Sequence, residues 1–339
     1  MTNFAALEAE GGKMKEELDT ITAKENICRK IEKYTQWKPI SIPESIPQGD
    51  MPGDKIIIDA THITRADTIF PELLKQLQQV FEKSIRQKAV ITVCGGSGVG
   101  KSEIASLLSY YFNEIGIGSY TLSGDNYPHR IPKYNDAERL RIFRSGAIRG
   151  LIDAGEYSPE RFRLIQGWQS AGEEDANPKH VTDYPWFEAY LRSGRAALDR
   201  YLGTRDEIGF EEVSSIVAEF KQGAGEIWLR RMGREETELW YEKVDFSRIQ
   251  ILIIEWTHGN SDHIRGVDIP ILLHSTPQET LAHRRARNRD GRTDSAFTTM
   301  VLEIEQSKLI KQAHKAKLIV SKTGELLSYE AFRKQMEEG

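Results

Sequence analysis

Residues 95–102 have the residue types and the spacing of a phosphate-binding loop. Their sequence, Gly-Gly-Ser-Gly-Val-Gly-Lys-Ser, fits the pattern G-x-x-x-x-G-K-[ST]. The glycines let the backbone curl so that its N–H groups face phosphate oxygens. We expect Lys101 to reach the β- and γ-phosphates of ATP and the Ser102 hydroxyl to ligate Mg²⁺. The predicted ATP site therefore consists of Gly95, Gly96, Ser97, Gly98, Val99, Gly100, Lys101 and Ser102.

The segments on either side of this loop determine whether the match to the pattern indicates a phosphate-binding site. Residues 88–94 are apolar and rich in β-branched side chains, which predicts a buried strand. Apolar residues then recur at helical spacing, at Ile104, Leu107, Leu108, Tyr111, Phe112 and Ile115. Strand, glycine loop and helix occur in the order that a phosphate site needs, with the helix N-terminus facing the anion. A chance glycine-rich turn is therefore the weaker interpretation.

Two acidic residues follow predicted strands elsewhere in the chain. Asp125 follows a strand at 119–122, and Glu255 ends the apolar segment 249–255. The carboxyl ends of strands in an open parallel sheet border the ligand crevice. Glu255 is therefore expected in the Mg²⁺ shell. Asp125 is placed either to meet a substrate hydroxyl beside the γ-phosphate or only to form a turn, and the spacing does not separate these alternatives.

Basic side chains gather shortly before the C-terminal part of the chain. The string at 276–279, Thr-Pro-Gln-Glu, is typical of a helix start. That helix leads into Arg284, Arg285, Arg287, Arg289 and Arg292, with a break at Asp290-Gly291. Close arginines repel one another unless an anion lies nearby. The two interpretations are a solvated basic helix end and a lid that closes over the phosphates of ATP.

The composition restricts the class of protein. The chain has 339 residues, a net charge of -5 and a pI of about 6.0, so no global basic field indicates nucleic acid. Two cysteines are too few for a disulfide framework or a cysteine-based zinc site. No apolar run reaches membrane-spanning length, and the N-terminus lacks the apolar region of a signal peptide. We expect a cytoplasmic protein with a small-molecule partner and no nucleic-acid or membrane partner.

The remaining segments predict helices around a sheet. Residues 1–87 are expected to form an extension for docking or homo-oligomerisation. This extension contains an amphipathic helix from about Lys15, a proline-rich linker at 39–53, a short strand at 56–58 and a helix after Pro71.

An insertion at about 131–202 is predicted to be helical. Asn135 and Glu138 form a capping-box pattern there, and Ser158-Pro159 opens a further helix. A helix ending near Gly223, a hairpin at 227–241, strands at 269–273 and 316–320 and a helix around 297–304 complete the prediction.

The order of these motifs resembles the phosphoribulokinase and uridine kinase family of P-loop kinases over roughly residues 88–325. Residues 123–127, Ser-Gly-Asp-Asn-Tyr, are similar to the family's strand-2 motif. Residues 254–259, Ile-Glu-Trp-Thr-His-Gly, resemble the phosphoribulokinase string Y-E-G-L-H-G, and the arginines at 284–292 resemble the family's lid. The resemblance implies a three-layer α/β/α P-loop kinase fold with a mostly parallel sheet. On this basis we assign 88–339 to the kinase domain, with the helical insertion, and 1–87 to the N-terminal helical extension.

The resemblance also implies roles for individual residues. Asp125 would be the catalytic base, assisted by Lys101 and by Arg289 and Arg292 of the lid, while Glu255 would lie by the metal. The substrate side would include Tyr127, His129, Arg130, Arg205 and His258, although a lone histidine such as His258 is more often structural.

Two departures restrict what the resemblance implies about the acceptor. Pro128 shifts His129 and Arg130 by one position, and residues 203–207 replace the element that uridine kinases carry there. The sequence therefore predicts an ATP-dependent kinase acting on a hydroxyl of a sugar, sugar phosphate or related acceptor. The alternatives are a nucleoside kinase and a nucleotide-dependent switch or scaffold.

Overall fold

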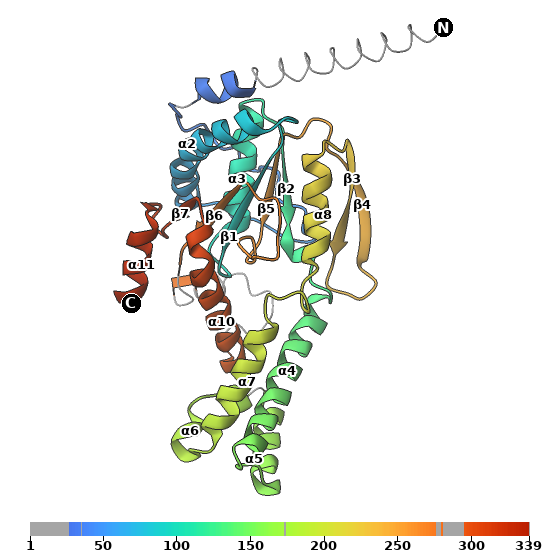
Figure 1. The fold of residues 1–339 in the computed structure, drawn as a ribbon, viewed down its shortest axis with the longest axis vertical. Helices are drawn as coiled ribbons and strands as arrows, with labels where there is room; N and C mark the ends of the chain where they lie inside the picture. Colours follow the sequence, from blue (N-terminus) through green and yellow to red (C-terminus); the bar gives the residue numbers. More distant parts are fainter. Residues whose placement is uncertain (1–26, 35, 173, 276–278, 281–294, 339) are drawn as a thin grey trace, which may run out of the picture.

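The computed structural model describes residues 27–34, 36–172, 174–275, 279–280 and 295–338. A sheet with helices on both sides forms the body of the molecule, and a bundle of helices projects from one end of it (Figure 1). The arginines at 284–292, including the predicted lid residues Arg289 and Arg292, lie outside the described residues.

The central sheet has six strands in the order β2-β5-β1-β6-β7-β8. Its first five strands are mutually parallel, and β8 pairs antiparallel with β7 at one edge. The strands span Ser119–Ser123 (β2), Ile251–Glu255 (β5), Ala89–Gly95 (β1), Ile269–Leu273 (β6), Leu318–Val320 (β7) and Leu326–Leu327 (β8). Glu255 is in register with Val93 on one side and Ser123 on the other, so three strand ends meet at one edge. The predicted parallel sheet is confirmed.

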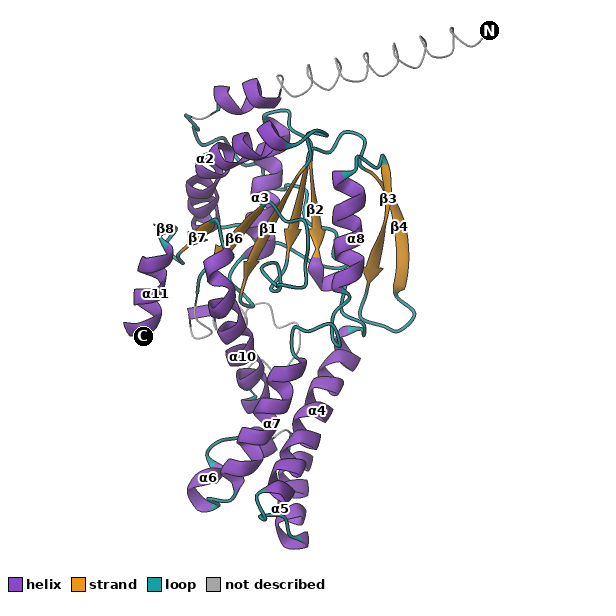
Figure 2. Ribbon diagram, viewed as in Figure 1, coloured by secondary structure: helices purple, strands orange, loops and turns teal. Residues whose placement is uncertain are grey.

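Alternate residues of the buried strands supply a hydrophobic core on each face of the sheet. On one face, Ile91 and Val93 of β1 pack with helices α2 (Ala60–Lys83) and α3 (Lys101–Glu114). On the other face, Val90 packs with α8 (Phe210–Lys221). Cys94 packs there with α10 (Ala296–Gln312) and α11 (Tyr329–Glu338). The three-layer α/β/α architecture is therefore confirmed. Figure 2 shows the hairpin of β3 (Glu226–Met232) and β4 (Leu239–Asp245) beside α8, separate from the main sheet.

The helical projection contains α4 (Pro132–Asp153), α5 (Pro159–Ser170), α6 (His180–Asp183) and α7 (Phe187–Tyr201). Helices α4 and α7 approach closely because small residues lie at their contact: a side chain at Gly194 would place its Cβ 2.6 Å from the Phe143 ring. The projection has its own hydrophobic core, to which α10 contributes Phe297, Met300, Val301 and Ile304. The predicted helical character of the insertion is confirmed.

The predicted N-cap at Asn135 is wrong. Helix α4 begins at Pro132, because proline has the φ that a first helical residue needs and no N–H that would remain unsatisfied there. Asn135 thus lies within the first turns, and its side chain donates a hydrogen bond to Glu207 instead.

The N-terminal extension differs from the prediction at two points. Helix α2 begins at Ala60 and contains Pro71, so the helix does not start after that proline. Asp59 accepts a hydrogen bond from the N–H of His62, and the His62 ring accepts one from the N–H of Asp59, which together form a capping box that starts the helix earlier. Residues 56–58 do not form a strand: Ile56 and Ile58 pack against the main core, and the N–H of Ile57 faces Glu103 Oε1 at 3.5 Å. Helix α2 buries an apolar face in the main core, with a further helix at 27–33.

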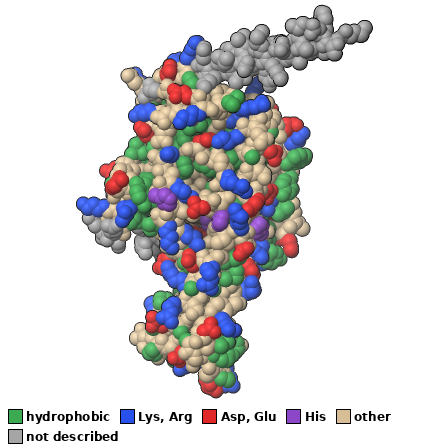
Figure 3. Space-filling model, in the orientation of Figure 1, with side chains coloured by type: hydrophobic (Ala, Val, Ile, Leu, Met, Phe, Trp, Pro, Cys, Tyr) green, Lys and Arg blue, Asp and Glu red, His purple; other side chains and the backbone are tan. Residues whose placement is uncertain are grey.

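Acidic and basic side chains alternate over the molecular surface shown in Figure 3 without a broad area of one sign. This distribution agrees with the small net charge of the sequence. Within the described part of the chain, none of the helices has both the length and the apolar character needed to cross a lipid bilayer.

Candidate active site

The phosphate-binding loop joins the end of β1 to the start of α3. Gly98 and Gly100 have φ values of 77° and 91°, in the left-handed region that glycine adopts without steric cost. A side chain at Gly100 would place its Cβ 2.7 Å from Nε2 of His62. Lys101 Nζ donates to the carbonyl oxygen of Gly96 at 3.1 Å, so the ammonium group lies over the loop. The loop therefore turns sharply between β1 and α3 through two glycines in the left-handed region.

Glu255, at the end of β5, connects the end of β2 to the start of α3. Its Oε2 accepts a hydrogen bond from Ser102 Oγ at 3.2 Å, and its Oε1 accepts one from Ser123 Oγ at 2.6 Å. The residue is only 4% exposed. Burial first, and the negative charge of Asp125 second, raise the pKa of Glu255 to about 8, although the charge of Lys101 acts in the opposite direction. A cation beside this carboxylate would stabilise its charged form.

The oxygen donors at this point suit Mg²⁺. Within the described residues no group of three His, Cys, Asp or Glu side chains could hold a metal ion. Mg²⁺ in phosphoryl-transfer sites is commonly bound by one or two protein oxygens together with substrate phosphates and water. The hydroxyl of Ser102 and the carboxylate of Glu255 match that requirement, because they lie together beside the phosphate-binding loop.

Asp125 lies on a short 3-10 turn, Gly124–Asn126, directly after β2. Its side chain is exposed, whereas Gly124 and Asn126 on either side are buried. A side chain at Gly124 would place its Cβ 1.9 Å from Cγ of Trp256, so the backbone there packs directly on the indole ring. Asn126 Oδ1 accepts a hydrogen bond from the N–H of Met232 at 3.0 Å. The turn is therefore anchored on both sides and presents one carboxylate close to Glu255.

Glu207 is the centre of a buried polar network opposite the strand ends. Its Oε1 accepts hydrogen bonds from Arg139 Nε at 2.6 Å and from Asn135 Nδ2 at 3.0 Å, and its Oε2 accepts one from the N–H of Gly203 at 2.6 Å. Burial would raise the pKa of Glu207, but the charge of Arg139 and these hydrogen bonds keep it below its ordinary value. The network fixes the loop 203–207 against the helical projection.

His258 lies against this loop. A side chain at Gly203 would place its Cβ 2.9 Å from Cε1 of His258. Burial lowers the pKa of His258 to about 4, although the charge of Glu207 raises it. The imidazole is therefore neutral at pH 7, and it also contacts the rings of Phe210 and Trp256.

The other predicted substrate residues are held by protein groups. Tyr127 is fully buried, with the guanidinium of Arg230 5.1 Å from its ring centre. His129 Nε2 lies 2.9 Å from the carbonyl oxygen of Arg205. Arg130 donates to the hydroxyl of Tyr201 at 3.0 Å. The Arg205 side chain forms an ion pair with Glu211, at 3.1 Å.

Several residues of the site are absent from the predicted set. Asn135, Arg139 and Glu207 form the buried network, and Glu305 of α10 lies 3.7 Å from Arg139. Burial raises the pKa of Glu305, and its carboxylate borders a small cavity with Gly96 and Ser97 of the loop. No short motif marks these residues, although the position of 203–207 just before the substrate-side helix was a signal for Glu207.

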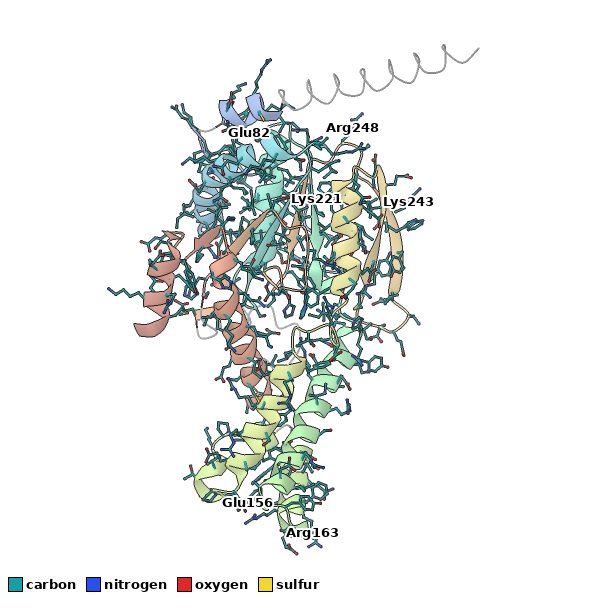
Figure 4. The ribbon with its side chains drawn as sticks, in the orientation of Figure 1. Glu82, Glu156, Arg163, Lys221, Lys243 and Arg248 are labelled. Carbon is teal, nitrogen blue, oxygen red and sulfur yellow. The ribbon has the colours of Figure 1, made fainter. Side chains whose placement is uncertain are left out.

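The site lies between the sheet and the helical projection. In Figure 4, Glu82 and Arg248 lie at the opposite end of the sheet body, and Glu156 and Arg163 lie at the tip of the projection. A cavity of about 760 Å³ lies elsewhere, between residues 47–53, β2 and β4, and no residue of the phosphate-binding loop lines it. The strand ends therefore locate the chemistry better than this cavity does.

The fold and the site together define a class of protein. A parallel sheet with a glycine loop after β1, a lysine and a serine at its end, and acidic residues after two neighbouring strands is the arrangement of a P-loop kinase. This arrangement agrees with the resemblance to the phosphoribulokinase and uridine kinase type that the order of the motifs indicated.

Over 252 residues the chain is 38% identical to the bifunctional alpha-galactosidase/sucrose kinase AgaSK of Mediterraneibacter gnavus. The match covers 74% of this chain and 22% of that protein, so the chain spans about a fifth of the relative's length. A match of this length within 339 residues must include the loop at 95–102 and the Asp125 turn. No family model matches the sequence.

Two solved structures resemble the fold. A candidate fructose transport system kinase from Silicibacter sp. TM1040 aligns with 66% of this chain and 84% of its own, with a TM-score of 0.38 and 14% identity. A candidate uridine kinase from Bacillus stearothermophilus aligns with 73% of this chain and 98% of its own, with a TM-score of 0.31 and 16% identity.

Proposed function

We propose that the protein is an ATP-dependent kinase that transfers the γ-phosphate to a hydroxyl group of a sugar. The observation that carries the proposal is the position of Asp125. Its exposed carboxylate lies on an anchored turn at the end of β2, and the neighbouring strand β5 ends at Glu255, which binds Ser102 of the phosphate-binding loop. Phosphoryl transfer to an alcohol requires such a carboxylate to orient the hydroxyl and take its proton.

In the proposed reaction the acceptor oxygen forms a bond to the γ-phosphorus while the bond to the β–γ bridging oxygen of ATP breaks, which releases ADP. The hydroxyl proton passes to Asp125. Lys101 and the N–H groups of the loop stabilise the negative charge of the transferring group. Mg²⁺, held by Ser102 and Glu255, neutralises phosphate charge when it is bound with ATP.

The acceptor is proposed to be a neutral sugar, with sucrose as the first candidate. The name of the relative includes a sucrose kinase, and the matched region contains the phosphate-binding loop that a kinase needs. The contacts of the site also favour a sugar without a phosphate group. Arg130 and Arg205 are engaged by Tyr201 and Glu211, and Arg139 is engaged by Glu207, so each of these guanidinium groups has a protein partner in place of an acceptor's phosphate.

A coupled assay of ADP release tests the proposal. Sucrose, glucose, fructose, fructose 6-phosphate and uridine would be compared at equal concentration with Mg-ATP, and each product would be identified by mass spectrometry. We expect phosphorylation of a neutral sugar. Phosphorylation of uridine alone, or of the sugar phosphate alone, would contradict the assigned acceptor, and turnover with none of a broad set of hydroxyl compounds would contradict kinase activity.

The variant Asp125→Asn is the matched control for this assay. It keeps the shape of the side chain and removes its basicity, so we expect unchanged affinity for Mg-ATP by calorimetry and a loss of transfer of about two to four orders of magnitude. Near-normal transfer by Asp125→Asn would show that another group, with Glu255 or His258 next in position, takes the proton.

A further inference from the structure

We infer that Asp50, in the extension that precedes the kinase domain, is a positioning residue for the carboxylate of Asp125. The inference rests on the proposed function and adds a residue from outside the region that the kinase motifs cover. Asp50 lies 75 positions before Asp125 in the sequence. It nevertheless contacts Ser123, just before the turn, and Asn126, the last residue of the turn.

The Asp50 carboxylate is bound on both of its oxygens. Its Oδ1 accepts hydrogen bonds from the N–H of Ser123 at 2.7 Å and from Asn126 Nδ2 at 3.2 Å. Its Oδ2 accepts from the hydroxyl of Tyr120 at 3.0 Å and from Arg231 at 2.9 Å. The side chain is only 8% exposed. Four donors from β2, the Asp125 turn and the hairpin therefore fix one carboxylate.

These contacts place Asp50 beside the edge strand β2, on the side where no other strand binds the backbone. Strand β2 is at the edge of the sheet, so only β5 binds its backbone in a ladder. On the other edge, the segment that carries Asp50 covers the strand: a side chain at Gly49 would place its Cβ 3.3 Å from the Thr121 methyl group. The N–H of Ser123 finds its acceptor in that segment. Asp50 thus completes the hydrogen bonding at the end of β2.

Asn126 extends the same connection to the far side of the turn. Its amide donates to Asp50 and its carbonyl oxygen accepts from the N–H of Met232 in the hairpin. Asp125 lies between Ser123 and Asn126, both of which Asp50 holds. The role is therefore one of orientation. A displacement of about 1 Å in a group that acts on the substrate lowers the rate by about a hundredfold.

The charge at Asp50 is also balanced locally. Burial raises the pKa of Asp50, while Arg231 and the N–H of Ser123 act in the opposite direction. Arg231 is itself buried and has a second carboxylate partner, Glu242, at 3.1 Å. The ion pair between Asp50 and Arg231 therefore connects the extension to the hairpin.

The test compares Asp50→Ala and Asp50→Asn with the control Asp67→Ala in the full-length protein. Asp67 is in the same extension and also accepts two hydrogen bonds from the core, from Tyr111 at 2.9 Å and Trp37 at 3.3 Å, but it lies away from the turn. We expect Asp50→Ala to lower kcat by about tenfold to a hundredfold with little change in KM for Mg-ATP. Asp50→Asn keeps an acceptor oxygen for Ser123 and should lower kcat less. Asp67→Ala should leave kcat per folded molecule unchanged.

Hydrogen–deuterium exchange without substrates gives a readout that does not depend on activity. Peptides covering residues 119–127 should exchange faster in both Asp50 variants than in the wild type and in Asp67→Ala. Unchanged exchange there, or an equal loss of kcat in Asp67→Ala, would overturn the inference. A wild-type protein that phosphorylates no acceptor would refute the proposed function, while the exchange experiment would still decide whether Asp50 holds the turn. If Asp50→Ala fails to fold, Asp50→Asn carries the same comparison.

Discussion

The substitution Glu255→Gln tests the electrostatics of the site most directly. Glutamine has nearly the shape of a protonated glutamate and can still accept hydrogen bonds from Ser102 and Ser123, but it does not titrate. Burial first and the charge of Asp125 second raise the pKa of Glu255 from an ordinary value of 4.5 to about 8. In the absence of a cation, the wild-type carboxyl is therefore largely protonated at neutral pH.

The sign of the effect follows from this pKa. Between pH 4.5 and about 8 the folded state holds a proton that the unfolded state has lost, so the free energy of unfolding falls as the pH rises. Each factor of ten in proton affinity corresponds to about 1.4 kcal/mol, so the wild type should lose roughly 3 kcal/mol relative to the variant between pH 6 and pH 9. The contributions of the other titrating groups to the pH dependence of stability cancel in this comparison, because both proteins contain the same groups.

Urea unfolding of the two proteins at pH 6 and pH 9, with EDTA and without nucleotide, measures this difference. We expect Glu255→Gln to become more stable than the wild type at pH 9, and the gap to shrink when both proteins also carry Asp125→Asn. Binding of Mg-nucleotide at pH 7 should release about one proton from the wild type and none from Glu255→Gln, as calorimetry in buffers of different ionisation enthalpy would detect. A stability gap that is the same at both pH values would refute the reasoning, because the carboxylate would then be ionised throughout.

Two further predictions concern the phosphate groups. Lys101→Ala should weaken Mg-ATP binding by about 1.5–3 kcal/mol through loss of a charge-assisted contact, and unchanged affinity and turnover in calorimetry and the ADP assay would contradict that role. Arg292→Ala, predicted from the sequence alone, should lower kcat by about tenfold or more if the lid arginines contact the developing charge. A variant that keeps its kcat and changes only in thermal stability would place Arg292 on the surface.

Sequence reasoning located the parts of the site that depend on local pattern. The loop at 95–102, the strand ends at Asp125 and Glu255 and the parallel sheet all follow from short-range spacing, because buried strands and glycine turns have strong local signals. Pro71 misled the prediction, since burial of the apolar face of α2 outweighs the loss of one helical hydrogen bond.

The contacts that join distant segments had no comparable signal. Glu207 and Arg139 are 68 positions apart, and Asp50 and Ser123 are 73 positions apart. Each is an ordinary charged residue in a polar stretch, and nothing in its immediate neighbours indicates burial. Which donor meets which carboxylate depends on how the projection, the hairpin and the extension pack on the sheet, and periodicity does not determine that packing.

Helix α10 has a consequence for how the two parts of the molecule depend on each other. Its first half contributes Phe297, Val301 and Ile304 to the core of the projection, and its second half contributes Leu309 to the core beside the sheet. A single helix is thus shared by two hydrophobic cores. The projection can neither swing freely on the sheet nor be cut away without exposing apolar side chains of α10 to water. The insertion is therefore a cooperative part of the fold. Substitutions in its outer helices can change the position of Glu305, which lies on the turn of α10 that faces the phosphate-binding loop.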